Sequence, residues 1–445
     1  MKEYPYWWDT VGGGGGRDSG FGVRDSDSRL PRPDSGLTNR RFDVAIVGAG
    51  YTGLAAARHL AHVGASVIVL DRERVGWGAS SRNGGQVITG TKLDPATLVA
   101  RFGAEKARQL FAISIDSIEA LEQLIAGEAI ACEYERTGHL QAAWKPSHFR
   151  AFRDEQALLA RVFQHRVEIV SRAEQRSELG SDAYHGLLID KRSAAINPAK
   201  YVDGLASAAR RRGAVIAPGH AVTRLSRKAS RWTVATAHGD IAMGDLDAGD
   251  VLVATNGYTN GAAPALRRRL VPIGSYIIAT EPLSAADAAS ILPRRRMAFD
   301  SKHFLFYFRL SADNRLLFGG RAEFGEPAPD TIKRAAAILH EGLVHTFPQL
   351  VSVRVDYAWG GNVAFTRDQM PRAGTLDDMY YAGGYCGHGI ALATYLGTLI
   401  ARRIAGEPLD HLLFDDHFAA IPLYRGHPWF LPLAGAYYRL RDMVG

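Results

Sequence analysis

The sequence predicts an α/β fold built on a buried parallel sheet, and two patterns predict it. Residues 42–47 are a short β-branched apolar run, 48–53 are rich in glycine, 54–63 favour a helix, and 66–70 are a second apolar run. Strand and helix alternate here at the spacing of a βαβ unit, whose parallel strands are buried on both faces. Strand-like runs appear again after residue 197, so the sheet-building pattern resumes late in the chain.

Length and composition describe a globular chain. Its 445 residues are 47% hydrophobic and 22% charged, which allows about three domains at ~150 residues each. The 53 Lys and Arg residues exceed the 46 Asp and Glu residues by 53 − 46 = +7, which is a small net charge for this length. Three arginine triplets, at 210–212, 267–269 and 294–296, have no aromatic residues between them, so we expect solvated surface and no nucleic-acid partner. Two cysteines, Cys132 and Cys386, are too few for a disulfide framework and indicate a reducing, cytoplasmic compartment.

Residues 1–40 precede the βαβ unit and carry two features. We expect an aromatic cluster to dock on the protein as an anchor, with a partner-binding peptide as the alternative; it comprises Tyr4, Tyr6, Trp7 and Trp8. Five glycines at 12–16 open a stretch with no apolar period, which is typical of a linker or arm. The start has no continuous apolar core followed by a small-residue cleavage site, so we expect no secretory signal.

The glycine-rich turn of the βαβ unit fits a dinucleotide-binding motif. Gly48, Gly50 and Gly53 follow the first strand and open the helix, where glycine permits a tight turn and close approach of a pyrophosphate. Asp71 ends the second strand 71 − 53 = 18 residues later, where a carboxylate can accept hydrogen bonds from a ribose. The motif alone does not separate NAD from FAD.

The segment after Asp71 favours a flavin. Residues 72–86 contain a run of small and amide-bearing residues, and no ordinary third βα unit begins there. Such a segment lets backbone approach a flat ring and supplies N–H donors to it. A surface loop is the alternative interpretation.

The middle of the chain alternates helical and strand-like patterns. Residues 98–126 predict one long helix that stops near Gly127. Asn197 and Pro198 form an N-cap and first-turn pair that opens another helix. Strands are predicted at 215–217, 222–225, 232–235 and 251–254.

Residues 303–310 alternate with period two, as a half-buried strand does. One face is apolar and carries Phe304, Phe306, Phe308 and Leu310, and the other carries His303, Leu305, Tyr307 and Arg309. We expect the second face to line a cavity, with Tyr307 and Arg309 binding a polar or carboxylate-bearing ligand. Pairing of Arg309 with an acidic side chain is the alternative.

The segment 379–401 has no Asp, Glu, Lys or Arg and is long enough to span a bilayer. Its first half is rich in glycine, so a strand at 379–383, a glycine turn and a helix explain it better, and we expect no transmembrane span. The positive end of that helix suits negative charge on a reduced flavin. His388 lies at this terminus, with either a structural role or a part in flavin or substrate chemistry.

These residues together resemble a known family. The matching segments are 47–54, 74–86, 253–258, 307–310, 315–321, 359–361 and 385–389. They resemble the glycine-oxidase and D-amino-acid-oxidase superfamily of flavoproteins, and within it the gamma-glutamylputrescine oxidoreductase group. The resemblance runs from about Tyr6 to the C-terminus, apart from the glycine-rich insertion.

The resemblance implies a Rossmann-like FAD-binding domain interleaved with an α+β substrate domain whose mixed sheet covers the flavin. The FAD-binding domain would comprise 41–90, 190–265 and 351–425, the substrate domain 91–189 and 266–350, and a C-terminal tail 426–445. The expected cofactor contacts are Gly48, Gly50, Tyr51, Thr52, Gly53, Asp71, Arg72, Gly78, Ala79, Ser80, Asn83, Gly84, Gly85, Gln86, Val222, Thr255, Asn256, Gly384, Gly387, His388, Gly389 and Ile390. Tyr307, Arg309 and Arg321 are the expected substrate contacts, and no metal site is expected.

Departures from the superfamily are equally informative. Some members attach FAD through a cysteine shortly before the last flavin segment, and residues 364–368 contain none, so we expect noncovalent FAD. Sarcosine-type oxidases hold the substrate carboxylate with a lysine where this chain has Ala391. Their oxygen-activating lysine matches Leu317 best, which leaves Arg321 or His388 as substitutes. A small N-methyl amino acid is therefore a poor guess, and we expect slow reaction with oxygen.

The sequence is thus interpreted as an FAD-dependent amine oxidoreductase. It would move a hydride from the carbon next to an amine nitrogen to flavin N5, leaving an imine that hydrolyses to an aldehyde. Gamma-glutamylputrescine or a related amine is implied by resemblance alone, with molecular oxygen or another electron acceptor. The alternatives are a dehydrogenase that uses a quinone or carrier protein and a non-catalytic FAD-binding protein. The basic, aromatic segment 427–441 is expected to pack as a tail, with contact to an acceptor or a membrane surface as the alternative.

Overall fold

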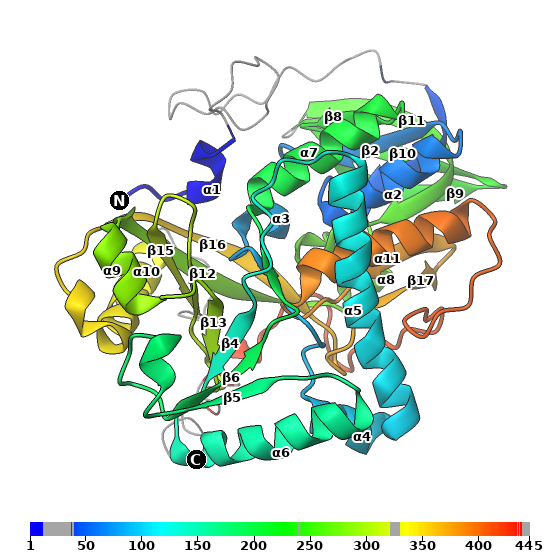
Figure 1. The fold of residues 1–445 in the computed structure, drawn as a ribbon. Coiled ribbons are helices and arrows are strands. Elements are labelled where there is room, and N and C mark those ends of the chain that lie inside the picture. The colour runs from blue at the N-terminus through cyan, green and yellow to red at the C-terminus, as the bar shows by residue number, and fades with distance from the viewer. Residues whose placement is uncertain are drawn as a thin grey trace.

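The computed structural model describes residues 1–11, 37, 40–238, 241–320 and 330–433, together with 435 and 437. Two eight-stranded sheets organise these residues (Figure 1). Arg321 lies outside the described residues.

The first sheet contains the predicted βαβ unit. β1 (Arg41–Val47) leads through the glycine turn into α2 (Tyr51–His62) and back to β2 (Val67–Asp71). The strand order β17-β18-β11-β1-β2-β8 places β1 in the interior, where its parallel neighbours are β2 and β11. The other strands are β8 (Val215–Pro218), β9 (Ala221–Lys228), β10 (Arg231–His238), β11 (Ile241–Val253), β17 (Arg372–Leu376) and β18 (Met379–Gly383). Distant segments therefore complete the sheet, as the sequence predicted.

Helix α2 packs between α7 (Pro198–Arg211) and α11 (Gly389–Ile404). Asn197 caps α7 by accepting a hydrogen bond from the N–H of Lys200, so the predicted cap is confirmed. The approach of α11 to α2 requires glycine at 397, because a Cβ there would lie 2.4 Å from the carbonyl oxygen of Thr52. The glycine turn of α2 and the start of α11 are thereby fixed relative to each other.

The second sheet has the order β16-β12-β15-β14-β13-β4-β6-β5. Its strands are β4 (His139–Ala142), β5 (Glu168–Ser171), β6 (Gly186–Asp190), β12 (Val271–Pro282), β13 (Met297–Asp300), β14 (Tyr307–Leu310), β15 (Arg315–Gly320) and β16 (Val355–Phe365). Helix α10 (Thr331–Thr346) contacts β12, β15 and β16. β16 pairs along its length with β12, so residues 355–365 belong to the second sheet. The sequence had assigned the whole segment 351–425 to the FAD-binding domain, which contains the first sheet.

Two sequence predictions about single elements need correction. The helix expected over 98–126 is two helices, α4 (Pro95–Phe102) and α5 (Ala104–Gly127), because Gly103 between them has φ +76°. The strand expected over 303–310 begins only at Tyr307. The remaining elements are α1 (Tyr6–Asp9), α3 (Ala79–Arg82), β3 (Gln86–Val87), α6 (Pro146–Val162), β7 (Ala194–Ala195), α8 (Pro264–Arg267) and α9 (Ala285–Ile291), with short 3₁₀ turns at Gln175–Ser177, Asn256–Tyr258 and Pro348–Leu350.

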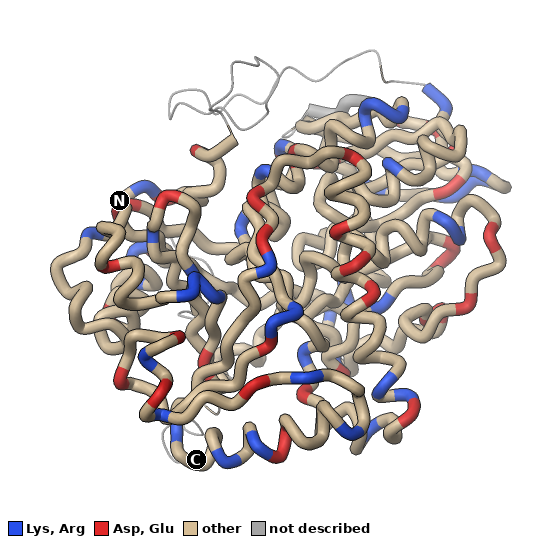
Figure 2. The backbone as a smooth tube through the Cα atoms, in the orientation of Figure 1, with Lys and Arg blue, Asp and Glu red and all other residues tan. Residues whose placement is uncertain are grey.

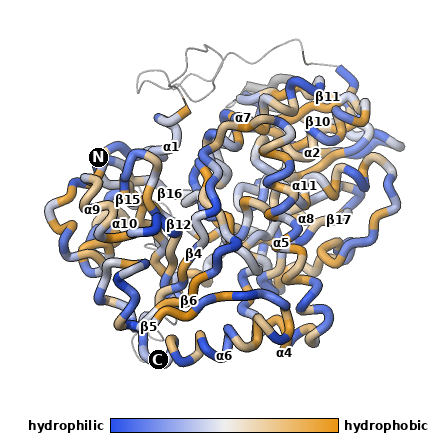
Figure 3. The backbone as a smooth tube through the Cα atoms, viewed as in Figure 1, coloured by the Kyte–Doolittle hydropathy of each residue, from blue (hydrophilic) through white to orange (hydrophobic). Residues whose placement is uncertain are grey.

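Charged residues of both signs are interspersed over the visible side of the molecule (Figure 2), and apolar positions occur on helices and strands alike (Figure 3). Members of two arginine triplets form ion pairs within the chain: Arg211 and Arg212 with Glu128, and Arg294 and Arg296 with Glu178. Among the described residues, no helix is both long and apolar enough to cross a membrane.

Candidate active site

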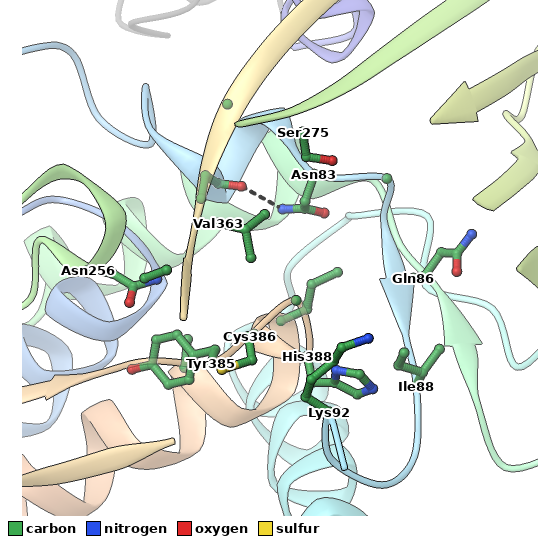
Figure 4. A pocket seen from close by; sticks show the side chains of 18 of the residues that line it. Asn83, Gln86, Ile88, Lys92, Asn256, Ser275, Val363, Tyr385, Cys386 and His388 are labelled. Carbon is green, nitrogen blue, oxygen red and sulfur yellow. Dashed lines mark hydrogen bonds between the residues drawn. The ribbon is translucent and has the colours of Figure 1, made fainter. Parts of the chain in front are cut away.

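A cavity of about 580 Å³ runs from the glycine turn of the first sheet to the inner face of the second sheet. Most of the expected cofactor residues line it: Gly48, Gly50, Tyr51, Thr52, Asp71, Arg72, Gly78, Ala79, Ser80, Asn83, Gly84, Gln86, Val222, Thr255, Asn256, Gly387, His388, Gly389 and Ile390. Gly53, Gly85 and Gly384 lie behind this wall. Residues from both ends of the chain meet around one space, as Asn83, Asn256, Ser275 and His388 do in Figure 4.

The dinucleotide turn has the geometry that the motif predicts. Gly48 has φ +110°, a conformation that L side chains rarely adopt. A Cβ at Gly53 would lie 2.0 Å from the carbonyl oxygen of Gly48, so only glycine fits there. The carboxylate of Asp71 accepts hydrogen bonds from the N–H groups of Ala49 (2.7 Å) and Glu73 (2.9 Å). Burial raises the pKa of Asp71 to about 6.

Helix α3 and its flanking residues form the second wall. The hydroxyl of Ser80 accepts a hydrogen bond from the N–H of Tyr51 at 3.0 Å, which ties α3 to the glycine turn. The side-chain amide of Asn83 donates to the carbonyl of Ala79 at 2.9 Å, while its oxygen accepts from the N–H of Gly85 at 2.9 Å. These contacts hold a segment of exposed backbone facing the cavity, as the composition of residues 72–86 suggested.

The third wall comes from the C-terminal half of the chain. The N–H of Gly384 donates to the side-chain oxygen of Asn256 at 2.8 Å, which joins the end of β18 to the turn after β11. Gly384 has φ +76°, and Gly387 has φ +95°. The turn therefore brings the N-terminus of α11 to the cavity, as predicted.

His388 is the N-cap residue of α11, is half-buried, and lines the cavity. Its Nδ1 atom is buried and has no hydrogen-bond partner among the described residues. Burial, and then the nearby charge of Lys92, lowers the pKa of His388 to about 3. The imidazole of His388 is therefore uncharged at neutral pH. Figure 4 shows Lys92 beside the His388 ring.

The second sheet contributes Tyr307 but not Arg309. The ring of Tyr307 packs over Gly319, where a Cβ would lie 2.3 Å from it, and its hydroxyl contacts the hydroxyl of Ser275 at 3.0 Å. Arg309 points to the same side of β14, but its guanidinium donates to the carbonyls of Gly85 (2.7 Å) and Ile196 (2.9 Å). Arg309 does not line the cavity, because backbone from the first half of the chain covers it.

Sequence reasoning missed several charged residues that line the cavity. Lys92 precedes α4, Glu155 lies on α6, and Lys302 follows β13. Lys302 lies over the ring of Phe306 and pairs with Asp300 at 3.0 Å. None of them belongs to a recognisable motif, so only the packing of α4, α6 and the second sheet reveals them. Leu317, by contrast, packs in the hydrophobic core and is not a lining residue.

The comparisons with known proteins fit this architecture. The sequence profile described as "DAO: FAD dependent oxidoreductase" matches residues 43–403. The chain belongs to this family of FAD-dependent oxidoreductases. This DAO-family enzyme is 35% identical over 411 residues to gamma-glutamylputrescine oxidoreductase of Escherichia coli, covering 91% of this chain and 93% of the relative. It is 33% identical over 402 residues to the probable oxidoreductase OrdL of Haemophilus influenzae, covering 89% of both chains.

Solved structures confirm the fold of the DAO-family enzyme. Glycine oxidase from Geobacillus kaustophilus superposes with a TM-score of 0.68 at 19% identity, over 86% of this chain and 99% of the other. L-proline dehydrogenase from P. horikoshii gives 0.65 at 17% identity, over 89% and 99%. The predicted interleaved flavoprotein fold is thus confirmed.

The residues of this chain fit FAD, the cofactor of the family. The first residues of α2 line the cavity next to Gly48 and Gly50, and the start of a helix beside such a glycine turn suits a pyrophosphate. Each oxygen of Asp71 keeps a lone pair beyond its backbone contact, so the carboxylate can accept from ribose hydroxyls. At the other end of the cavity, the Nδ1 atom of His388, which has no hydrogen-bond partner among the described residues, can form a hydrogen bond with a polar group of the cofactor. Within the described residues, no group of His, Cys, Asp and Glu is placed to hold a metal ion.

Proposed function

We propose that this enzyme oxidises an amine at the carbon next to its nitrogen. The neutral amine loses a hydride from that carbon and becomes an iminium ion, the protonated imine, which water hydrolyses to an aldehyde and a protonated amine or ammonium. When bound, FAD supplies the acceptor of the hydride. The observation that carries the proposal is the continuity of the cavity, because residues of the dinucleotide turn and of the second sheet line the same space.

The length of the cavity supports an extended amine. Its lining crosses the second sheet from Tyr307 on β14, through Phe299 on β13 and Gln141 on β4, to Leu188 on β6. Three strand-to-strand steps of about 4.8 Å make this path roughly 14 Å long. Gamma-glutamylputrescine, named in the relative from Escherichia coli, is an elongated molecule with its reactive amine at one end. We therefore propose gamma-glutamylputrescine or a similarly extended amine as the substrate.

The charge at the far end of the cavity supports the same class. Glu155 has no hydrogen-bond or ion-pair partner among the described residues, and burial raises its pKa to about 7. Apolar side chains of Phe111, Leu159 and Leu188 line the cavity with it. An alkyl chain that ends in an ammonium or amide group would satisfy both the apolar wall and the lone carboxylate.

Near the start of α11, the chain's own groups favour the neutral form of the reacting amine. His388 stays uncharged because it is buried, so its imidazole acts as a hydrogen-bond partner. Lys92 lies beside it, and a positive charge there disfavours the ammonium form of an amine in the same cavity. A neutral amine is the form that can release a hydride from the neighbouring carbon.

Two further features belong to the proposal. We infer that FAD is noncovalent, because residues 364–368 contain no cysteine. The thiol of Cys386 donates a hydrogen bond to the carbonyl of Gly384, and burial raises the pKa of this thiol to about 11. We propose molecular oxygen or another oxidant as the electron acceptor. We also infer a cytoplasmic location, because both cysteines are buried free thiols. Anaerobic mixing with amines tests the central proposal, because a substrate must bleach the flavin absorbance.

A further inference from the structure

Three buried indole groups hold the C-terminal end of α3. Trp8 donates its Nε1–H to the hydroxyl of Ser81 at 2.8 Å. Trp359 donates to the carbonyl of Arg82 at 2.9 Å, and Trp7 donates to the carbonyl of Asn83 at 2.9 Å. Three consecutive residues of the cofactor-facing segment thus each receive one tryptophan N–H.

Helix α3 depends on such partners. It spans only Ala79–Arg82, and a helix of one turn is not stable alone because nucleation costs more than one hydrogen bond returns. The last carbonyls of any helix lack partners inside the helix. Here the side-chain amide of Asn83 donates hydrogen bonds to the carbonyls of Ala79 and Ser80, and two indole N–H groups donate to the carbonyls of Arg82 and Asn83.

Two of the three indoles come from the N-terminal clamp, which we define as residues 2–10. Trp7 is fully buried and Trp8 is 9% exposed. Two cations lie over the Trp8 ring: the guanidinium of Arg74 is 3.5 Å and that of Arg82 is 4.9 Å from its centroid. The aromatic anchor expected from the sequence therefore docks on the segment that faces the cofactor.

The other side of the N-terminal clamp is bound to the second sheet. The N–H of Lys2 donates to the carbonyl of Asp356 at 2.7 Å, and the N–H of Ala358 donates to the carbonyl of Lys2 at 2.9 Å. The hydroxyl of Tyr6 donates to Asp313 at 2.6 Å. Figure 1 shows α1 between the strands of the second sheet and α7. The clamp thus joins α3 to the edge of the substrate-side sheet.

We propose that the N-terminal clamp is a positioning element of the flavin site, acting through Ser81 and Asn83. None of its residues lines the cavity, whereas Gly78, Ala79, Ser80, Arg82 and Asn83 do. Its indole donors hold the hydroxyl of Ser81 within α3 and the carbonyl of Asn83 directly after it, and α3 in turn fixes the wall against which the cofactor binds. The inference concerns cofactor binding and does not depend on the identity of the amine.

The test uses full-length variants that remove single donors and keep an aromatic ring. Trp7→Phe and Trp8→Phe each delete one N–H together with part of the indole ring, and Trp232→Phe is the matched control, because Trp232 is also buried and loses the same volume but lies in β10. We measure the FAD dissociation constant after reconstitution, the visible absorption of the bound flavin, and the thermal midpoint. The double variant should bind FAD roughly tenfold more weakly and show a shifted flavin band, because the Ser81 hydroxyl and the Asn83 carbonyl each lose an indole donor.

A double-mutant cycle locates the effect. Ser81→Ala removes the acceptor of Trp8, and Ser81 does not itself line the cavity, although its hydroxyl also donates to the carbonyl of the lining residue Gly76 at 2.6 Å. The effects of Trp8→Phe and Ser81→Ala should therefore not add if the bond between Trp8 and Ser81 carries the effect. The proposal is overturned if the double tryptophan variant lowers only the thermal midpoint, with FAD affinity and flavin band equal to those of Trp232→Phe. It is also overturned if the effects of Trp8→Phe and Ser81→Ala are fully additive. If the double variant does not fold, the single Trp8→Phe variant and the cycle decide the point.

Discussion

The carboxylate of Asp71 accepts a 2.7 Å hydrogen bond from the backbone N–H of Ala49. This contact joins the end of β2 to the glycine turn of α2, and it places a half-buried carboxylate where the cavity meets the turn. One residue therefore shapes the turn and offers its remaining lone pairs to a ribose.

Replacing Asp71 with Ala should weaken FAD binding. The variant loses charge-assisted hydrogen bonds to the ribose, each worth about 1.5 to 3 kcal/mol. Equilibrium dialysis of the apoprotein with FAD measures the effect. Asp43→Ala is the matched control, because Asp43 lies on β1 and bonds only to Ser66 among the described residues. Equal FAD affinity of the two variants would remove Asp71 from the cofactor site.

Acid precipitation should release all the flavin into the supernatant. The Cys386 thiol lines the cavity, but its raised pKa leaves almost no thiolate to attack a flavin carbon at neutral pH. Absorbance of the supernatant and of the redissolved pellet measures the partition. Flavin that stays with the pellet of the wild type, but not with that of Cys386→Ala, would show a covalent bond at this residue.

His388 should make the enzyme sensitive to acid. Its pKa is about 3 in the folded protein and 6.5 ordinarily, so below pH 6.5 the unfolded chain takes up a proton that the folded protein does not. Stability is therefore lost as the pH falls from 6.5 toward 3, by about 2 kcal/mol at pH 5.

Thermal midpoints of the holoenzyme at pH 7 and pH 5 test this. His388→Asn should show a smaller drop between the two pH values than the wild type, and His417→Asn, a change at an exposed residue, should behave as the wild type. An equal drop in all three proteins would mean that His388 titrates normally.

Glu155 should govern the recognition of the far end of the substrate. Glu155→Gln should lower kcat/KM roughly tenfold for an amine with a distal ammonium group, through loss of a charge-assisted hydrogen bond. The loss should be larger at pH 8 than at pH 6, because the pKa of about 7 leaves the carboxylate charged only at the higher pH. Asp154→Asn, the exposed neighbour on α6, serves as control. A simple alkylamine without a distal charge should be oxidised equally well by all three proteins, and a loss for that amine too would contradict the assignment.

Local patterns predicted the nucleotide-binding half of the site well. The turn at Gly48, the acid at Asp71 and the helix start at His388 each depend on residues close in sequence, so their spacing carries the information. Arg309 shows where this reasoning ends. The period-two pattern placed it correctly on the face of Tyr307, but backbone at Gly85 and Ile196, distant in sequence, covers it.

The sequence could not predict charge states or contact partners either, because both depend on residues that are distant in sequence. The low pKa of His388 comes from burial by several elements, and Glu155 joins the cavity only because α6 packs across α4 and the second sheet. The aromatic cluster at residues 4–8 was recognised as an anchor, but its target, α3, is seen only in the folded chain.

Anaerobic stopped-flow reduction of the FAD-loaded enzyme tests the central claim most directly. The panel comprises gamma-glutamylputrescine, putrescine, a monoamine and glycine, with dithionite as the control for a reducible flavin. The account predicts that an extended amine bleaches the flavin fastest and yields one aldehyde per flavin reduced. If no amine bleaches a flavin that dithionite reduces fully, the assignment as an amine oxidoreductase is wrong.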